Sequence, residues 1–135
     1  MKEWEASYLA GIIDGEGSIT LTRMHKGEFR RPCISISSTD KELLIYIKSL
    51  TDGVINNKKN YNPARHKDSY TLTIKKKEKV FEVLEKIHPY LRISKKRARA
   101  LWILKYYENV SPRNGKYSST LLKQKHQFEE AFLKL

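Results

Sequence analysis

Residues 9–17 read Leu-Ala-Gly-Ile-Ile-Asp-Gly-Glu-Gly, so that two carboxylates and three glycines close a short apolar segment. The apolar side chains before them recur at helical spacing, and glycines are typical helix-stop residues, which predicts a first helix over about residues 4–13. Asp14 and Glu16 then lie just past a helix end, where unpaired carbonyl groups carry a partial negative charge. A divalent metal ion would compensate that charge, whereas residues 14–17 also fit a glycine-rich turn from helix to strand.

The composition favours a polyanionic partner. The chain has 135 residues, enough for one domain over residues 1–135, and its 27 Lys and Arg against 15 Asp and Glu give a net charge of +12. We expect a soluble intracellular protein, in a bacterial or phage cytoplasm or in an organelle, because no apolar run approaches the roughly 20 residues that span a bilayer. Nucleic acid is therefore the expected partner, and no membrane. Cys33 is the only cysteine, so any metal must be held by oxygen ligands.

Periodicity and turn signals predict alternating helices and strands after the first helix. Thr39 to Glu42 has the form of a capping box, and Ser94 is expected to cap a later helix. The predicted strands are 18–24, 33–38, a short one from about 54, and 70–75; the predicted helices start near 41, 80, 94 and 121. The order αββαββα, with further C-terminal helices, predicts an α+β sandwich whose four-stranded antiparallel sheet has helices on one face only.

The open face of this sheet is the predicted binding surface for double-stranded DNA. Its side chains are small and polar or basic, and such groups on a twisted ribbon of strands can contact phosphates and base edges in the major groove. Many solvent-exposed sheet faces are also rich in Thr and Lys, which is the alternative explanation. Near the C-terminus, Lys116, Lys123, Lys125 and His126 are expected to contact the DNA backbone or to face water. The predicted DNA contacts are Thr20, Thr22, Arg30, Arg31, Ser35, Ser37, Lys59, Thr71, Thr73 and Lys75.

One side of the first helix carries small residues, among them Ser7, Ala10 and Gly11. Small side chains allow two helix backbones to approach closely, so these residues are the predicted interface of a homodimer. A twofold axis along that interface would bring the acidic ends of two helices together. The joint site could then hold divalent ions with hard oxygen ligands, which suits Mg²⁺ and the hydrolysis of a phosphodiester bond.

The stretch of residues 9–17 closely resembles the signature of the LAGLIDADG homing endonucleases, and the predicted element order fits essentially the whole chain. The resemblance implies that Glu16 and the backbone carbonyl of Gly15 bind the catalytic metal, with a secondary catalytic part for Asp14. Mg²⁺ is the expected ion, with Mn²⁺ as a substitute. Because the motif occurs once, the resemblance also implies an intron-encoded homodimer that cuts both strands of a long, nearly palindromic site and leaves 3′ overhangs.

Residues 89–98 resemble the segment before the fourth helix of that family, where a basic residue, often lysine, assists catalysis. Alignment without gaps places Ser94 there, and a shift of one or two residues places Lys95 or Lys96 there instead. We favour Lys96 as the catalytic lysine. The alternative is that Ser94 caps the helix while the two lysines contact phosphate or water.

The sequence therefore predicts a homodimeric, Mg²⁺-dependent, site-specific DNA endonuclease that joins through its first helix. Two alternatives keep the fold: an intron RNA maturase and a DNA-binding protein impaired in cleavage. An unrelated basic protein with a purely structural acidic turn is the remaining alternative.

Overall fold

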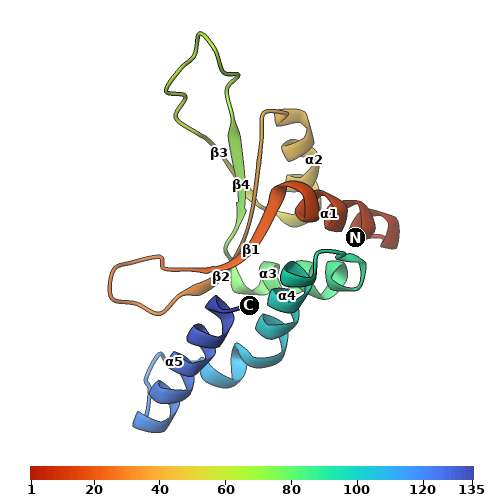
Figure 1. Ribbon diagram of the computed structural model, residues 1–135. Coiled ribbons are helices and arrows are strands. Elements are labelled where there is room, and N and C mark those ends of the chain that lie inside the picture. Colours follow the sequence, from red (N-terminus) through yellow and green to blue (C-terminus); the bar gives the residue numbers. More distant parts are fainter.

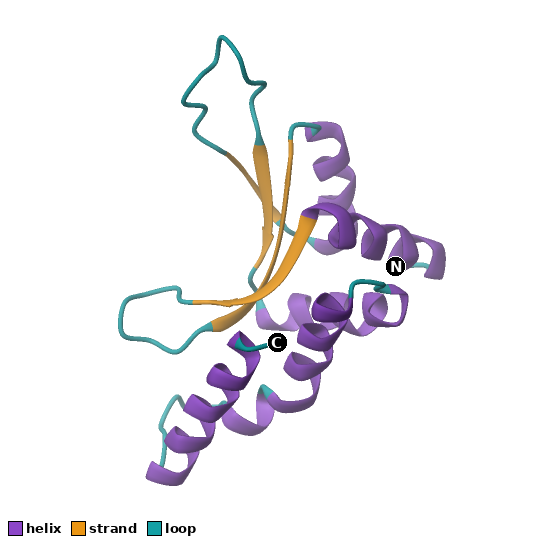
Figure 2. Ribbon diagram, in the orientation of Figure 1, coloured by secondary structure: helices purple, strands orange, loops and turns teal.

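The computed structural model describes residues 1–135 as a four-stranded antiparallel sheet with helices on one side and an open face on the other (Figures 1 and 2). The order of the elements confirms the predicted α+β fold. They are α1 (Glu3–Glu16), β1 (Gly17–Thr22), β2 (Arg31–Ser38), α2 (Lys41–Thr51), β3 (Val54–Asn57), β4 (Tyr70–Ile74), α3 (Lys77–Ile87), η1 (His88–Tyr90), α4 (Ser94–Tyr106), η2 (Glu108–Val110) and α5 (Ser119–Leu133). No helix is both long enough and apolar enough to cross a membrane.

The strand order is β1-β2-β4-β3, so β1 and β3 form the two edges of the sheet. Ile19 pairs with Ile34 and Ser18 with Ser35 in the register of β1 with β2. Because side chains alternate along a strand, this register places isoleucines against isoleucines on one face and hydroxyls against hydroxyls on the other. The same alternation continues into β4, where Leu72 lies opposite Ile36 and Thr71 opposite Ser37.

The helical side of the sheet holds a core cluster of 23 buried residues. Leu9 and Ile13 of α1 and Ile34 and Ile36 of β2 are all 0% exposed. Burying one such side chain stabilises the fold by about 1.5–3 kcal/mol, so the apolar alternation fixes which face of the sheet is free.

Helix α1 is longer than the sequence predicts. It runs through Gly15 and ends at Glu16, so both acidic residues lie in its last turn rather than beyond its end. Gly17 ends it, and its backbone N–H donates to the Ile13 carbonyl. A Cβ at Gly17 would lie 2.9 Å from the Ile13 Cα, closer than such atoms approach, so glycine permits the tight turn from α1 into β1.

Two predicted caps are wrong. Asp40 is the N-cap of α2 and makes no side-chain cap hydrogen bond, so the capping box of Thr39 and Glu42 does not form. Ser94 is the first residue of α4, and Ile93 holds the capping position without a side-chain bond. The short links that precede both helices set where each one begins, and sequence spacing alone does not reveal this.

Candidate metal and nucleic-acid site

The two carboxylates of the motif have different surroundings. Both oxygens of Asp14 accept backbone N–H groups from the link between η1 and α4, with Arg92 N at 2.8 Å and Ile93 N at 3.1 Å. The Asp14 carboxylate therefore fastens the end of α1 to this link. These bonds give Asp14 a structural contact within the chain. Its secondary catalytic part stays a prediction.

Lys96 lies at the same helix end. Its Nζ donates to the carbonyl of Ile13 at 2.7 Å and to that of Asp14 at 2.8 Å. A cation that binds the last carbonyls of a helix offsets the partial negative charge there. The sequence predicted a metal ion for this compensating role, and Lys96 supplies part of it. Lys96 is thus a basic residue bonded to the motif, whereas Ser94 and Lys95 are exposed at the start of α4 and form no hydrogen bond with it.

Glu16 is exposed, and its carboxylate forms no hydrogen bond or ion pair within the chain. Gly15 is likewise exposed, and a Cβ there would meet no atom within 4 Å. A carboxylate oxygen and a nearby backbone carbonyl are hard ligands that suit Mg²⁺. One chain supplies too few of them, since no three His, Cys, Asp or Glu side chains gather at any point. The donor set fits a divalent ion only when a second set of ligands completes it.

The outer face of α1 differs from its prediction at one residue. Ser7 and Gly11 are exposed, and space for a Cβ at Gly11 is open. Ala10 is 0% exposed, so it packs inside the chain and is removed from the predicted interface. Two aromatic residues join this face instead, because Trp4 is 62% and Tyr8 46% exposed. Trp4 and Tyr8 recur at helical spacing, which does not by itself distinguish a buried face of the helix from an exposed one.

Hydroxyl groups connect the strands across the open face of the sheet. Ser18 Oγ lies 2.8 Å from Ser35 Oγ, and Ser37 Oγ lies 3.2 Å from Thr71 Oγ1. Lys58 Nζ donates to Ser37 Oγ at 3.4 Å. These pairs keep the polar side chains ordered and half-exposed, so the face offers donors and acceptors without an apolar patch.

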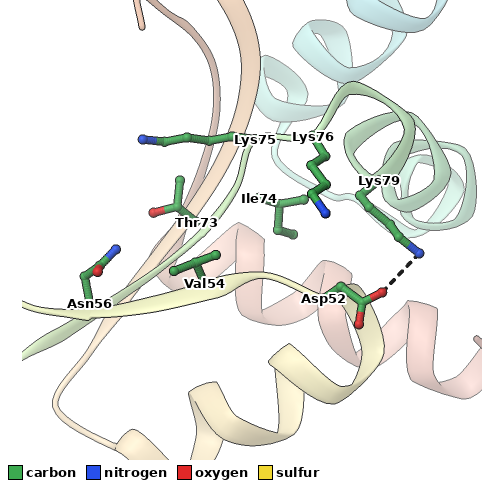
Figure 3. A pocket seen from close by; sticks show the side chains of 8 residues that line it. All are labelled: Asp52, Val54, Asn56, Thr73, Ile74, Lys75, Lys76 and Lys79. Atoms are coloured by element: carbon green, nitrogen blue, oxygen red, sulfur yellow. Dashed lines mark ion pairs between the residues drawn. The ribbon is translucent and has the colours of Figure 1, made fainter.

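The edge of this face at β3 and β4 is shown in Figure 3. A shallow pocket of about 210 Å³ is lined there by Val54, Asn56 and Thr73 of the strands and by Lys75, which directly follows β4. Asp52 and Lys79 close its lower end through an ion pair of 3.1 Å (Figure 3). The carboxylate of Asp52 raises the pKa of Lys79, so this ammonium group is committed to protein contacts. Lys75 has no such partner and extends away from the pair (Figure 3).

The remaining predicted DNA contacts fall into two groups. Thr20, Thr22, Ser35 and Thr73 line the open face and are half-exposed. The others are charged and lie at its margins, and their surroundings differ. Arg30 Nη1 lies 2.8 Å from Glu129 Oε1, a pair whose carboxylate side chain is 8% exposed, so this nitrogen is engaged within the chain. The contact of Arg30 with DNA stays a prediction. Arg31 is exposed and only 3.6 Å from Glu28 Oε2, and Lys59 is exposed in the long β3–β4 loop.

A family model described as the LAGLIDADG-like domain matches residues 3–88, more than half of the chain. The chain belongs to this family. A sequence search of curated proteins finds no match.

Solved structures show the same fold in other members of the LAGLIDADG group. The homing endonuclease I-CvuI, in complex with its target, is 18% identical with a TM-score of 0.74, and the match covers 96% of this chain and 80% of that chain. I-TnaI, also a homing endonuclease, is 19% identical with a TM-score of 0.65, covering 93% and 86%. I-SmaMI, bound to an uncleaved DNA target, is 20% identical with a TM-score of 0.68, covering 99% and only 45%.

Proposed function

We propose that this LAGLIDADG-like protein is a site-specific, double-strand DNA endonuclease that acts as a homodimer with a divalent metal ion. The observation that carries the proposal is that the charged residues at the end of α1 have different surroundings. Asp14 and Lys96 fasten that end in place, and Glu16 is left exposed and unpaired directly before edge strand β1. An unpaired carboxylate at a helix C-terminus is unfavourable by itself, which favours a ligand role.

Glu16 and the Gly15 carbonyl would hold Mg²⁺, for which Mn²⁺ substitutes, with the same two groups of a second copy completing the ligand set. When bound, the ion activates water and stabilises charge on the scissile phosphate. Lys96 keeps the last carbonyls of α1 fixed, so Glu16 is presented in one orientation. The ammonium group also supplies positive charge beside the site, where charge develops during phosphodiester hydrolysis.

The DNA would lie on the open face of the sheet. The half-exposed hydroxyls of Thr20, Thr22, Ser35 and Thr73 can donate to or accept from base edges. The exposed Arg31, Lys59 and Lys75 can neutralise phosphates at the margins. The net charge of +12 predicts that affinity falls steeply with salt concentration.

Chain length supports the homodimer. The match covers 80% of I-CvuI but only 45% of I-SmaMI, so this chain corresponds to about half of the longer protein. The exposed Ser7 and Gly11 allow two copies of α1 to approach closely. The family resemblance adds the remaining details: a long, nearly palindromic site, cleavage of both strands with 3′ overhangs, and an intron as the encoding element.

Selection of cleaved sites from a randomised duplex DNA library with Mg²⁺ tests the proposal. The parent protein should enrich one site, which Glu16→Gln binds but does not cut. Glu85→Gln is the matched control, because Glu85 is an exposed acid on α3, away from the motif. Cutting by Glu16→Gln would remove Glu16 from the metal site. Binding of DNA without cutting by the parent would favour the cleavage-impaired alternative, and binding of intron RNA alone would favour the maturase.

A further inference from the structure

The loop between β1 and β2, residues 23–30, projects well beyond the paired part of its strands (Figure 1). Residues 23–28 are all exposed and include the basic Arg23 and Lys26. One backbone hydrogen bond, from Glu28 N to His25 O at 3.3 Å, lies within the loop. The loop therefore depends on contacts at its return end, residues 29 and 30, for a defined position.

Those contacts are all made with the C-terminal part of the chain. The backbone N–H of Arg30 donates to Glu129 Oε2 at 3.0 Å, and Arg30 Nη1 donates to Glu129 Oε1 at 2.8 Å. The carboxylate therefore fixes both the main chain and the side chain of Arg30 to α5. Glu129 is 6% exposed, and a buried carboxylate with two donors from one residue is a strong, directional contact.

Phe29 adds an aromatic contact next to this ion pair. Its ring centroid lies 5.0 Å from that of Tyr117 and 5.1 Å from that of His126. Lys125, predicted to face DNA or water, is instead 1% exposed beneath it, with Nζ at 2.6 Å from Ser111 Oγ and 4.3 Å from the Tyr107 ring centroid. Burial lowers the pKa of Lys125 to about 8.

Two clefts flank this attachment. One, of about 640 Å³, lies toward residues 107–117, and the other, of about 780 Å³, lies toward the outer side of α5. Phe29 and Arg30 line both clefts and so separate them. The loop is thus joined to the rest of the molecule by a narrow bridge rather than by a broad packed surface.

We propose that α5 sets the position of the β1–β2 loop on DNA, with Glu129 as the positioning residue that acts through Arg30. This inference rests on the proposed function, since the loop would contact DNA beyond the central part of the sheet. Arg30 then contributes by holding the loop rather than by contacting DNA. Fixing the loop reduces the ordering cost on binding, so base pairs near the ends of the site are discriminated more strongly.

The test compares Glu129→Gln with Glu130→Gln. Both substitutions remove one negative charge from adjacent positions of α5, so both change long-range attraction to DNA equally. Glu130 is exposed and pairs only with Lys134 at 3.6 Å, so its variant leaves the bridge intact. Unfolding midpoints show that each variant is folded. Arg30→Gln removes the other partner of the same ion pair, whose side chain is more exposed than that of Glu129.

The probe is the duplex that the parent selects from a randomised library in Ca²⁺, together with duplexes substituted at central or at outer base pairs. Glu129→Gln should lose about tenfold in discrimination at outer positions and keep its discrimination at central ones. Amide hydrogen exchange of residues 24–30 in the free protein should become about tenfold faster. The charge-exchanged double variant Arg30→Glu with Glu129→Arg should recover part of both losses.

Equal behaviour of Glu129→Gln and Glu130→Gln in discrimination and in exchange would overturn the inference. An equal loss of discrimination at central and outer positions would also overturn it, because that result indicates general destabilisation. If the parent selects no duplex at all, the proposed function fails, and a role of α5 in placing the loop on DNA fails with it. If the parent selects a duplex and Glu129→Gln matches the parent in discrimination and in hydrogen exchange, only the present inference is overturned.

Discussion

The end of α1 and helix α5 both hold acidic side chains close to basic ones, yet the two regions differ in which of these charges are paired or buried. At the end of α1, Asp14 is bound by backbone amides and Glu16 is left free two residues later. On α5, Lys125 and Glu129 are both buried, and Glu130 next to them is exposed. A charge that is fully paired holds the structure, and an unpaired exposed charge is available for a ligand.

Removing the unpaired carboxylate is expected to have the largest effect. Glu16→Gln should lower the cleavage rate of the selected duplex by at least about 100-fold, because the amide is a poor ligand for a hard cation. Its unfolding midpoint should equal or slightly exceed that of the parent, since Glu16 forms no contact within the chain and its charge is unfavourable at a helix C-terminus. Cleavage rates across a Mg²⁺ titration, with Glu85→Gln alongside, measure this; full activity at high Mg²⁺ would show that Glu16 only tunes affinity.

Removing the paired carboxylate should act on stability first. Asp14→Asn turns one acceptor into a donor that faces a backbone N–H, either Arg92 N or Ile93 N. The free energy of unfolding should fall by about 1 kcal/mol, because hydrogen bonds from two exposed backbone amides to a charged carboxylate are weakened. Urea denaturation of the parent and of both acid-to-amide variants measures the difference. Equal midpoints for Asp14→Asn and Glu16→Gln would show that the two acids contribute equally to stability, contrary to the prediction.

The buried lysine of α5 should make stability depend on pH. The pKa of Lys125 is lowered from 10.5 to about 8 by burial, so between these values the unfolded chain binds more protons than the folded chain. Stability therefore rises with pH across that window, by about 2 kcal/mol once solvent screening is allowed for. Urea denaturation at pH 7.5 and pH 9.5 measures the rise.

Lys125→Met is the matched variant for this pH dependence, and it should lose the rise. Lys123→Met, which removes an exposed lysine of the same helix, should keep it. Both measurements stay below pH 10, because burial raises the pKa of Tyr107 and its ionisation adds an opposite effect above that pH. A parent whose stability is flat over the window would show that Lys125 is charged at no cost.

The smallest expected effect concerns the outer face of α1. Gly11→Leu should weaken the dimer by at least about tenfold, because the added side chain separates two closely packed backbones. The protomer itself should keep its fold, since a Cβ at Gly11 meets no atom within 4 Å. Sedimentation equilibrium measures the dimer, with Gln127→Leu as a control that adds leucine at an exposed position of α5. An unchanged dissociation constant would place the interface elsewhere.

The elements of the fold were predictable because their signals are local. Alternation of apolar and polar side chains in residues 18–22 and 70–74 identified strands, and the buried face of each is the face predicted. The motif likewise indicated the family, because residues 9–17 closely resemble the family's signature. The errors lie at the ends of helices and on one helix face: the end of α1, the caps of α2 and α4, and the inward side of Ala10.

The sequence by itself determined the fold class, the basic surface and the position of the acidic motif, since these follow from periodicity, composition and a contiguous stretch. Only the tertiary structure decided which acid is free, which lysine lies at the end of α1 and which charges of α5 are buried. Lys96 meets Asp14 across 82 residues, and Arg30 meets Glu129 across 99. Charges so far apart in the chain are brought together only by the packing of the helices, so no local pattern can distinguish a paired charge from an available one.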